Sequence, residues 1–464
     1  MFDKSVYVNR RRAIARGIGG GIALIPGNNE SPANYPANTY KFRQDSSFLY
    51  LFGLNHPGLA GVIDADTGED FIYGDDAGID DIIWTGPQPS VREMAESAGA
   101  RGASPFTRLA GVLRDAIAAG RRVHFLPPYR SLNALLLEEM LGIHHSLLKR
   151  YASLELIRAL VASRSVKEPR EIEEIARACD IGREMHVRAM QEARPGVREQ
   201  YIAGLLEGIA ASRGSMVSFP VILSQNGETL HNHDHGQVLS TGRMMLTDAG
   251  AETSLNYCSD FTRTVPVGGK FTSRQREVYE IVLECNQRAM ELARPGVTYR
   301  WVHVETCKVL ARGLKALGLM KGDVDEAVAA GAHALFMPHG LGHMMGLDVH
   351  DMEDLGQVHV GYDEETRPAE QFGLASLRMG RRLEEGFVVT DEPGCYFIPA
   401  LIDRWRAERK HEAFLAYDKI ETFKDFGGIR VEDDLLITRD GAVCLGERRV
   451  PATVKEIEET MRAE

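Results

Sequence analysis

The sequence predicts a two-domain α+β protein, in which a smaller α/β domain at residues 1–160 precedes a larger domain at residues 161–464. Three observations support this prediction. At 464 residues the chain is longer than the roughly 250 to 300 residues that one hydrophobic core usually organises. Apolar runs alternate with helix-like stretches in the first third of the chain. Farther along, strand-like segments surround the polar clusters, and one short string recurs.

Residues up to about 155 show the alternation typical of an α/β domain. IALIP, FLYLFGL, GVIDA and RRVHFLPP are strand-like, whereas SVREMAESAGA and SLNALLLEEMLGI are helix-like. Arg10, Arg11 and Arg12 stand before the apolar GIGGGIALIPG, as in a secretory signal. However, Asp3 precedes the arginines, the run is rich in glycine and no small-x-small cleavage site follows. We therefore expect a helix that leads into a buried strand.

Composition disfavours several kinds of partner. The 54 Lys and Arg residues against 66 Asp and Glu give a net charge of −12, which repels phosphate backbones, so no nucleic-acid partner is expected. No stretch reaches the roughly 20 apolar residues that span a bilayer, so we expect no membrane partner and a cytoplasmic protein.

The cysteines form no Cys-x-x-Cys pair, which indicates buried free thiols rather than disulfides or a structural zinc site. They are Cys179, Cys258, Cys285, Cys307, Cys395 and Cys444.

A domain boundary is expected near residues 155–165, because a long helix follows it. Pro169 suits the first turn of that helix, acidic residues cluster after it, and Ile172, Ile175 and Cys179 recur at helical spacing. Later in the chain, RAMQEARPGV from Arg188 is matched by RAMELARPGV from Arg288, 100 positions on. Chance similarity of one short string is one explanation. We favour a duplicated helix-loop-helix unit, which would give two related halves around a central site.

Five ligand-type side chains lie on or beside strand-like segments of the second domain. Asp248 in LTDAG and Asp260 in CSDFT are placed where one hairpin would bring them together, although a single Asp at a strand end is usually a turn former. His343, Glu392 and Glu432 follow in PHGLGHMMGLDVHD, TDEPGCY and GGIRVEDD. A carboxylate within an apolar strand is costly unless it is paired or bound to metal.

These ligand types predict a dinuclear metal site. Four carboxylates and one imidazole form a hard, oxygen-rich set that suits Mn first, with Co, Zn or Fe as alternatives. Four carboxylates also carry enough charge for two divalent ions. Two such ions can share and activate one water molecule and polarise the carbonyl group that it attacks.

Together these segments resemble the creatinase/aminopeptidase family, and within it the proline-specific branch of aminopeptidase P and prolidase. FRQDSSFLYLFGL near residues 42–54 is similar to the N-terminal domain of that branch, and the five residues match its metal ligands in order. The resemblance implies a C-terminal pita-bread domain with an internal pseudo-twofold repeat. Asp260 lies twelve positions after Asp248, one more than the commonest family spacing. A bulge or a longer hairpin turn would absorb the extra residue.

The resemblance also implies a role for each ligand. Asp260 and Glu432 would bridge both metal ions, Asp248 would hold one of them, and His343 with Glu392 would hold the other. Glu392 would also pass a proton to the leaving amine, because it would lie beside the attacking water.

Three further histidines match histidines of the family that are not ligands. His231 in TLHNHDH and His350 in LDVHD would donate hydrogen bonds to the substrate carbonyl oxygen as it becomes an oxyanion. His339 in MPHGLGH would line the pocket or orient the leaving group. Without the metal ligands, exposed or structural histidines would be the simpler interpretation, and for His233 and His235 we expect surface positions.

Two arginines complete the predicted site. Arg430 would share a strand face with Glu432, where it would hold a carboxylate, contact substrate or simply balance charge. The LRMGRR run and the long insertion between EPGCYF and GGIR resemble prolidase. In prolidases the first arginine of that run, here Arg378, binds the free carboxylate of a dipeptide's proline, and a planar guanidinium suits that task. A surface salt bridge is the alternative for Arg378.

The leading functional hypothesis is a prolidase that cleaves Xaa-Pro dipeptides, and its partners would be small peptides with proline at the second position. An Xaa-Pro aminopeptidase that acts on longer peptides is the alternative. A catalytically silent binding protein and a metal-free amidinohydrolase are disfavoured because all five ligand positions are filled. No Gly-x-Ser-x-Gly elbow supports a serine hydrolase. Relatives with this N-terminal domain usually pair, so the resemblance implies a homodimer.

Overall fold

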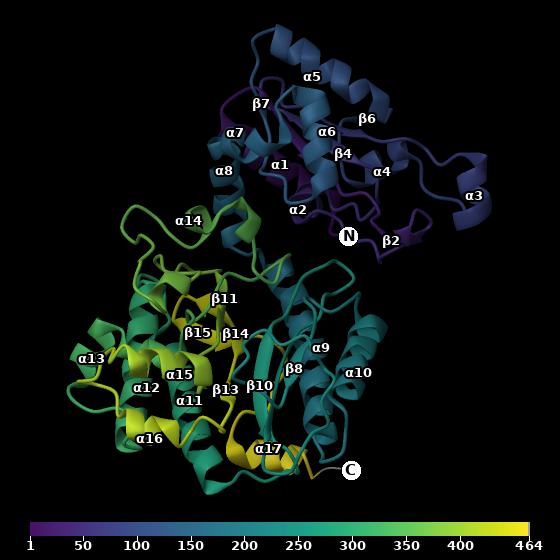
Figure 1. Cartoon of the computed structure of the whole chain (residues 1–464). Helices are drawn as coiled ribbons and strands as arrows, with labels where there is room; N and C mark the ends of the chain where they lie inside the picture. The colour runs from purple at the N-terminus through teal and green to yellow at the C-terminus, as the bar shows by residue number, and fades with distance from the viewer. Residues whose placement is uncertain (463–464) are drawn as a thin grey trace. The chain divides into compact units, whose positions relative to one another are not determined.

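The computed structural model describes residues 1–462 and shows two compact units (Figure 1). The first consists of Met1–Arg164 and Glu353–His359, and the second consists of Ser165–Met352 and the remainder of the chain from Val360. Both units combine helices with sheet, so the predicted two-domain α+β class is confirmed. Within residues 1–462, no helix has both the length and the apolar character needed to cross a bilayer.

The first unit is built on a five-stranded mixed sheet with the strand order β6-β5-β4-β1-β7. Its strands are β1 (Ile22–Pro26), β4 (Ala60–Asp64), β5 (Asp70–Tyr73), β6 (Gly102–Ser104) and β7 (Val123–His124), with a separate hairpin of β2 (Pro32–Tyr35) and β3 (Asn38–Thr39). Its helices are α1 (Lys4–Ile18), α2 (Ser46–Phe52), α3 (Ile79–Thr85), α4 (Val91–Ser97), α5 (Leu109–Ala118), α6 (Ser131–Leu141), α7 (Leu148–Tyr151) and α8 (Leu154–Ser165). Short 3-10 turns cover Phe106–Arg108, His145–Leu147 and Glu353–Leu355.

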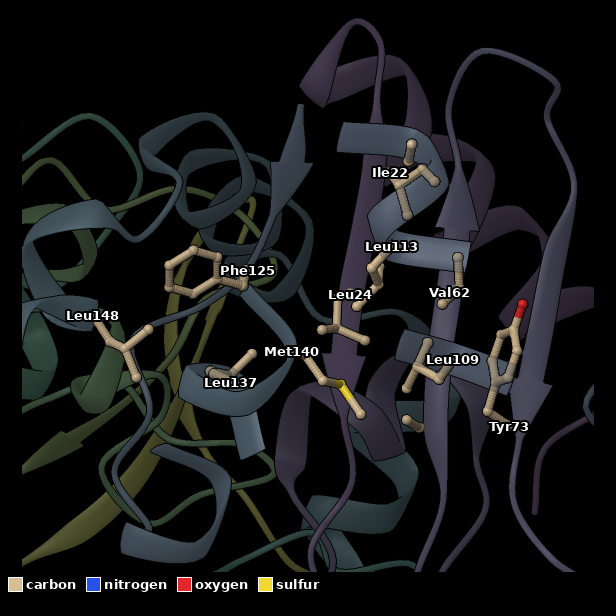
Figure 2. Close-up of a cluster of buried hydrophobic side chains, with 12 residues drawn as sticks. Ile22, Leu24, Val62, Tyr73, Leu109, Leu113, Phe125, Leu137, Met140 and Leu148 are labelled. Carbon is tan, nitrogen blue, oxygen red and sulfur yellow. The ribbon is translucent and has the colours of Figure 1, made fainter. Parts of the chain in front are cut away.

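The core of the first unit contains side chains from the sheet and from helices α5 and α6 (Figure 2). Ile22 and Leu24 lie two positions apart on β1 and therefore point to the same face. Leu109 and Leu113 from α5 are fully buried in the same cluster. Burying each such side chain stabilises the fold by roughly 1.5 to 3 kcal/mol.

The predicted helix and buried strand at the N-terminus are both present, as α1 and β1. The Asp3 carboxylate caps α1 by accepting a hydrogen bond from the Ser5 N–H at 2.9 Å. Arg11 is buried and its Nε donates to Asp70 at 2.6 Å, while Arg10 lies over the Tyr50 ring at 3.9 Å. The basic cluster is therefore part of the folded core.

The strand expected at FLYLFGL is wrong, because this segment forms helix α2. Every residue of α2 is buried, so no polar face marks the helical period in the sequence. Its caps are local: Asp45 accepts from the Phe48 N–H at 2.8 Å, and Gly53 ends the helix with a φ of 69°.

The second unit contains two three-stranded antiparallel sheets, ordered β10-β9-β8 and β11-β14-β15, and a pair of strands, β12 and β13. Its strands are β8 (Ile222–Ser224), β9 (Met244–Ala249), β10 (Phe261–Pro266), β11 (Val388–Asp391), β12 (Gly394–Tyr396), β13 (Gly428–Arg430), β14 (Asp433–Thr438) and β15 (Gly441–Cys444). Its helices are α9 (Pro169–Glu192), α10 (Glu199–Arg213), α11 (Ser273–Leu292), α12 (Tyr299–Ala316), α13 (Val324–Ala330), α15 (Pro399–Ala407), α16 (Tyr417–Glu421) and α17 (Val454–Thr460), with 3-10 turns at η3 (Ala332–Leu335) and Leu374–Ser376. Helix α14 (Gln357–Val360) runs from the first unit into the second.

The repeated string corresponds to a repeated helix-loop-helix in the second unit (Figure 1). α9 ends at Glu192 and α10 begins at Glu199. In the second copy, α11 ends at Leu292 and α12 begins at Tyr299, each 100 positions later. The loops between them are also alike. Gly196 has a φ of 89° and donates its N–H to the Leu239 carbonyl oxygen, while Gly296 has a φ of 88° and donates to that of Leu383, both at 2.9 Å. Matching helices, turns and hydrogen bonds indicate a duplicated unit rather than chance similarity.

Candidate metal centre

Strands β9 and β10 place the first two predicted ligands on one face of a sheet. Asp248 lies opposite Thr262, and Ala249 lies opposite Phe261. Asp260 comes directly before β10, two positions from Thr262, so its side chain and that of Asp248 share a face. Both carboxylates are buried.

The pairing between the segments that carry these two aspartates is continuous up to their turn, so an extra residue would lie in the turn. Beyond the strands, the same register continues to a bridge between Glu252 and Cys258. The turn then closes where the Thr253 N–H donates to the Tyr257 carbonyl oxygen at 2.9 Å. Within it Asn256 adopts a φ of 65°, a conformation that asparagine tolerates better than most residues. The register of the two ligands is therefore unaffected.

The remaining predicted ligands come from the second half of the unit. Glu432 lies between β13 and β14; its N–H donates to the Thr262 carbonyl oxygen at 3.0 Å, and its carboxylate accepts from the Thr262 hydroxyl at 2.6 Å. His343 lies in the loop after η3, and its N–H donates to the Thr390 hydroxyl at 3.1 Å. The same hydroxyl donates to Glu392, which directly follows β11, at 3.1 Å.

All ten side chains predicted for the site line one cavity of about 530 Å³ in the second unit. They are His231, Asp248, Asp260, His339, His343, His350, Arg378, Glu392, Arg430 and Glu432. Apolar side chains, among them Phe219, Ile222 and Leu230, form other parts of the wall. A concave, largely apolar cavity with a few convergent polar groups is typical of a small-molecule site.

The orientation of His343 suits it to bind a cation. Its Nδ1 lies 3.0 Å from the Met344 carbonyl oxygen, which can only accept, so Nδ1 carries the proton. In the neutral ring Nε2 then has a lone pair, and it faces Asp260 at 3.4 Å and Glu392 at 3.6 Å. The lone pairs of these three groups therefore face one another. A cation bound between them would be attracted to all three and would offset their mutual repulsion.

Most of the buried carboxylates in the cavity have raised pKa values. Burial raises the pKa of Asp260 well above its usual range, and the nearby Asp248 raises it further. Burial followed by repulsion from Asp260 does the same to the pKa of Glu432. For Glu392 burial also raises the pKa, but the nearby His343, His339, Arg430 and His350 together outweigh burial and the net pKa is lowered. The protein's own cations, Arg430 among them, therefore offset the repulsion among these carboxylates only in part.

The donor set fits divalent metal ions. Among residues 1–462, the buried Oδ1 atoms of Asp248 and Asp260 have no hydrogen-bond partner. Ligand atoms of Asp260, His343 and Glu432 all lie within 4.8 Å of one another. Carboxylate oxygens with one imidazole favour hard or borderline divalent ions. Unsatisfied buried carboxylate oxygens are costly unless such an ion is bound.

Arg430 contacts Asp248 rather than its strand neighbour Glu432, with Nη2 2.5 Å from Oδ2. Its Nη1 donates to the Tyr396 hydroxyl at 2.8 Å, and that hydroxyl donates to Nε2 of His339 at 2.9 Å. Nδ1 of His339 in turn donates to the Gly340 carbonyl oxygen at 2.8 Å. The chain of hydrogen bonds has one donor and one acceptor at every step. It fixes both the predicted ligand Asp248 and the His339 ring.

The other predicted residues lie around the opening and the wall of the cavity. His350 is half-buried, and its ring stacks on His343 with 3.7 Å between the ring centroids. His231 and Arg378 are exposed side chains that line the cavity. His233 is exposed, as expected, but it also lines the cavity, whereas His235 lies 3.0 Å from the Leu223 carbonyl oxygen.

Several residues outside the predicted set support the site. Tyr396 stands in the EPGCYF run, but only the pairing of β12 with β13 brings its hydroxyl to Arg430. Asp434 accepts a hydrogen bond from the Asp260 N–H at 2.9 Å and thereby holds that ligand. Asp433 is buried, and its Oδ1 lies 2.7 Å from Nη2 of Arg263. A sequence signal existed for these last two, since consecutive acidic residues in a buried strand require partners.

Two family models match the chain. Residues 173–439 match the metallopeptidase family M24, and residues 7–124 match the aminopeptidase P N-terminal domain. The chain is 32% identical to the Xaa-Pro dipeptidase of Homo sapiens, over 95% of this chain and 89% of that protein. It is also 32% identical to a probable Xaa-Pro aminopeptidase of Aspergillus clavatus, over 90% and 88%.

Solved structures are similar over nearly the whole length. Aminopeptidase P from Escherichia coli with the inhibitor Pro-Leu has a TM-score of 0.81 and 29% identity, over 99% of this chain and 98% of that chain. Aminopeptidase P from Pseudomonas aeruginosa has a TM-score of 0.80 and 28% identity, with the same shares covered. The resemblance inferred from the sequence is confirmed. The chain belongs to metallopeptidase family M24, with an aminopeptidase P N-terminal domain before its catalytic domain.

Proposed function

We propose that this chain is a metal-dependent prolidase, which hydrolyses the bond between the first residue and proline in Xaa-Pro dipeptides. One observation carries the proposal: five ligand-type side chains line the same cavity as Arg378, and among residues 1–462 one buried carboxylate oxygen of Asp248 and one of Asp260 have no hydrogen-bond partner. Curated relatives are named as a dipeptidase and a probable aminopeptidase for Xaa-Pro bonds.

The ligands divide by their position in the cavity. His343 lies close to both Asp260 and Glu392, so these three would hold one ion. Asp248, held by Arg430, would contribute to the other, and Asp260 with Glu432 would serve both. Two divalent ions bound there would supply Lewis acidity and lower the pKa of a water molecule.

Three side chains would act on the substrate. Glu392 would take a proton from the attacking water and return it to the leaving proline nitrogen, because its carboxylate is held by Thr390 at the cavity wall and its pKa is lowered by His343 and His339. His231 and His350 would donate to the carbonyl oxygen as negative charge develops on it. His339, held by Tyr396, would contact the proline ring or orient the leaving group.

Arg378 would select dipeptides by binding the carboxylate that follows directly after proline. In a tripeptide that carboxylate is one residue farther away, so the paired hydrogen bonds to the guanidinium would be lost. We expect Arg378→Ala to lower kcat/KM for Ala-Pro by about 10- to 100-fold, mainly through KM, and to affect Ala-Pro-Ala much less. Steady-state kinetics with the two peptides measure this difference.

Arg382→Ala is the matched control, because Arg382 belongs to the same LRMGRR run but is exposed and paired with Glu365. Its kinetics should equal those of the unmodified protein. If the protein cleaved only the longer peptide, the prolidase proposal would be wrong and the aminopeptidase alternative would replace it. Equal losses on both peptides would mean that Arg378 does not read the carboxylate.

Three finer points belong to the same proposal. We expect Mn in both metal positions because oxygen ligands predominate, with Co, Zn or Fe as substitutes. A cytoplasmic location fits the six cysteines, none of which forms a disulfide within residues 1–462. A homodimer is expected from the family resemblance, and the molar mass in solution tests it.

A further inference from the structure

A second group of metal-ligating side chains lies outside the cavity described above. His303 and Cys307 are four positions apart on α12 and therefore share one face of the helix. His333 from the turn η3 faces them, with its ring 6.4 Å from that of His303. All three residues are buried, and each offers a ligand atom within 4.8 Å of those of the others.

The spacing between these atoms suits a tetrahedral site. Sγ of Cys307 lies 3.5 Å from Nε2 of His303. Sulfur and nitrogen ligands of one tetrahedral zinc ion are roughly 3.6 Å apart, given the usual bond lengths. A thiol hydrogen bond to the imidazole gives the same distance, so this pair alone does not indicate a metal.

His333 supplies the independent observation. Its Nδ1 is buried and has no hydrogen-bond partner among residues 1–462. The whole residue is only 5% exposed. A buried imidazole nitrogen without a partner is costly. Both His303 and His333 also line a cavity of about 410 Å³ in the second unit, which offers room for an ion and for a water molecule.

We propose that His303, Cys307 and His333 bind one soft or borderline ion of the zinc type, separate from the carboxylate centre. Two imidazoles and a thiolate favour such ions, whereas Mn and Mg favour oxygen ligands. Water from the cavity would complete four ligands. The ion would tie α12 to the segment that leads from η3 to His339 and His343.

The protonation states agree with this site. Burial lowers the pKa of His303 to about 3 and that of His333 to about 4, so both rings are neutral and able to bind metal at neutral pH. Burial raises the pKa of the Cys307 thiol, so the thiol keeps its proton until an ion binds. Binding forms the sulfur–metal bond and releases that proton to solvent.

Titration of the reduced, metal-free full chain with Co²⁺ under anaerobic conditions tests the proposal. The carboxylate centre has no sulfur ligand, so a thiolate-to-cobalt charge-transfer band in the near ultraviolet reports this site alone. We expect the band to saturate at one Co²⁺ per chain and to disappear when Zn²⁺ is added. Absence of the band from the unmodified protein would overturn the proposal.

Variants identify the residues. Cys307→Ser should abolish the band, whereas Cys285→Ser should keep it, because Cys285 is equally buried but lies outside the group. His333→Ala should weaken Co²⁺ binding at least tenfold; because the change truncates a buried side chain, circular dichroism of the variant checks that it folds. A band that survives Cys307→Ser, or Co²⁺ affinity unchanged in His333→Ala, would contradict the site.

Discussion

At the residue scale, the Tyr396 hydroxyl links the charged Arg430–Asp248 pair to the His339 ring. Tyr396 accepts from Arg430 and donates to His339, and burial raises the pKa of its phenol, so it stays protonated. Without this hydroxyl, the Arg430 side chain that holds Asp248 would lose one of its three partners. Groups that orient metal ligands in this way commonly affect metal affinity or activity.

We therefore expect Tyr396→Phe to lower metal affinity or kcat by roughly 10- to 100-fold. The fold should be retained, because the ring itself is preserved. Tyr279→Phe is the matched control: Tyr279 is also fully buried and its hydroxyl donates to the Ala452 carbonyl oxygen, outside the cavity. Metal titration and kinetics of both variants give the comparison, and equal behaviour of the two would refute a positioning role for Tyr396.

At the scale of elements, a buried histidine connects α9 to the sheet that carries Asp248. Nε2 of His186 donates a hydrogen bond to the carbonyl oxygen of Ala249 at 3.0 Å. Burial lowers the pKa of His186 to about 4, from an ordinary value near 6.5. The folded state therefore binds fewer protons than the unfolded state between these values. The contribution of His186 to the free energy of unfolding is fully present above pH 6.5 and is lost as the pH falls towards 4.

His186→Gln removes the titrating group and leaves an amide that can still donate to Ala249. The unmodified protein should lose roughly 3 kcal/mol more of its free energy of unfolding between pH 7 and pH 4 than the variant does. Denaturant unfolding at a series of pH values measures this loss. Parallel pH profiles would show that His186 is not kept neutral by the fold.

The repeated loops depend on glycine at one position. Gly296 has a φ of 88°, and a Cβ atom there would meet nothing within 4 Å, so only backbone strain opposes a side chain. Gly296→Ala should lower the free energy of unfolding by about 1 kcal/mol. Gly204→Ala is the control within helix α10, where space is also open; there alanine should stabilise by roughly 0.5 to 1 kcal/mol. Changes of the same sign in thermal unfolding would contradict this account.

Elements that depend on neighbouring residues could be predicted from the sequence, whereas contacts between distant segments could not. IALIP became β1 and the Pro169 segment became α9, because strand composition and a helix start are encoded locally. FLYLFGL was mistaken for a strand because a fully buried helix has no polar face. Tyr396 was missed since its role depends on β12 pairing with β13, more than 30 positions away. The His303 group was missed because its members form no short motif.

At the scale of the whole molecule, ligands from both repeated halves meet in one cavity. Asp248 and Asp260 come from the first sheet, and Glu392 and Glu432 from segments near β11 and β14. The bridge between Thr262 and Glu432 fixes the two halves together at the carboxylates themselves. The duplicated fold thus concentrates negative charge in a buried place, and bound cations are what would stabilise that charge.

The most direct test of this claim is electron paramagnetic resonance of the full-length protein during titration with Mn²⁺, which the sulfur-containing group does not favour. We predict two Mn²⁺ bound per chain with a spectrum of two exchange-coupled ions, and loss of that coupling in Asp260→Asn. Binding of no Mn²⁺, or of ions that remain uncoupled at saturation, would contradict the dinuclear centre.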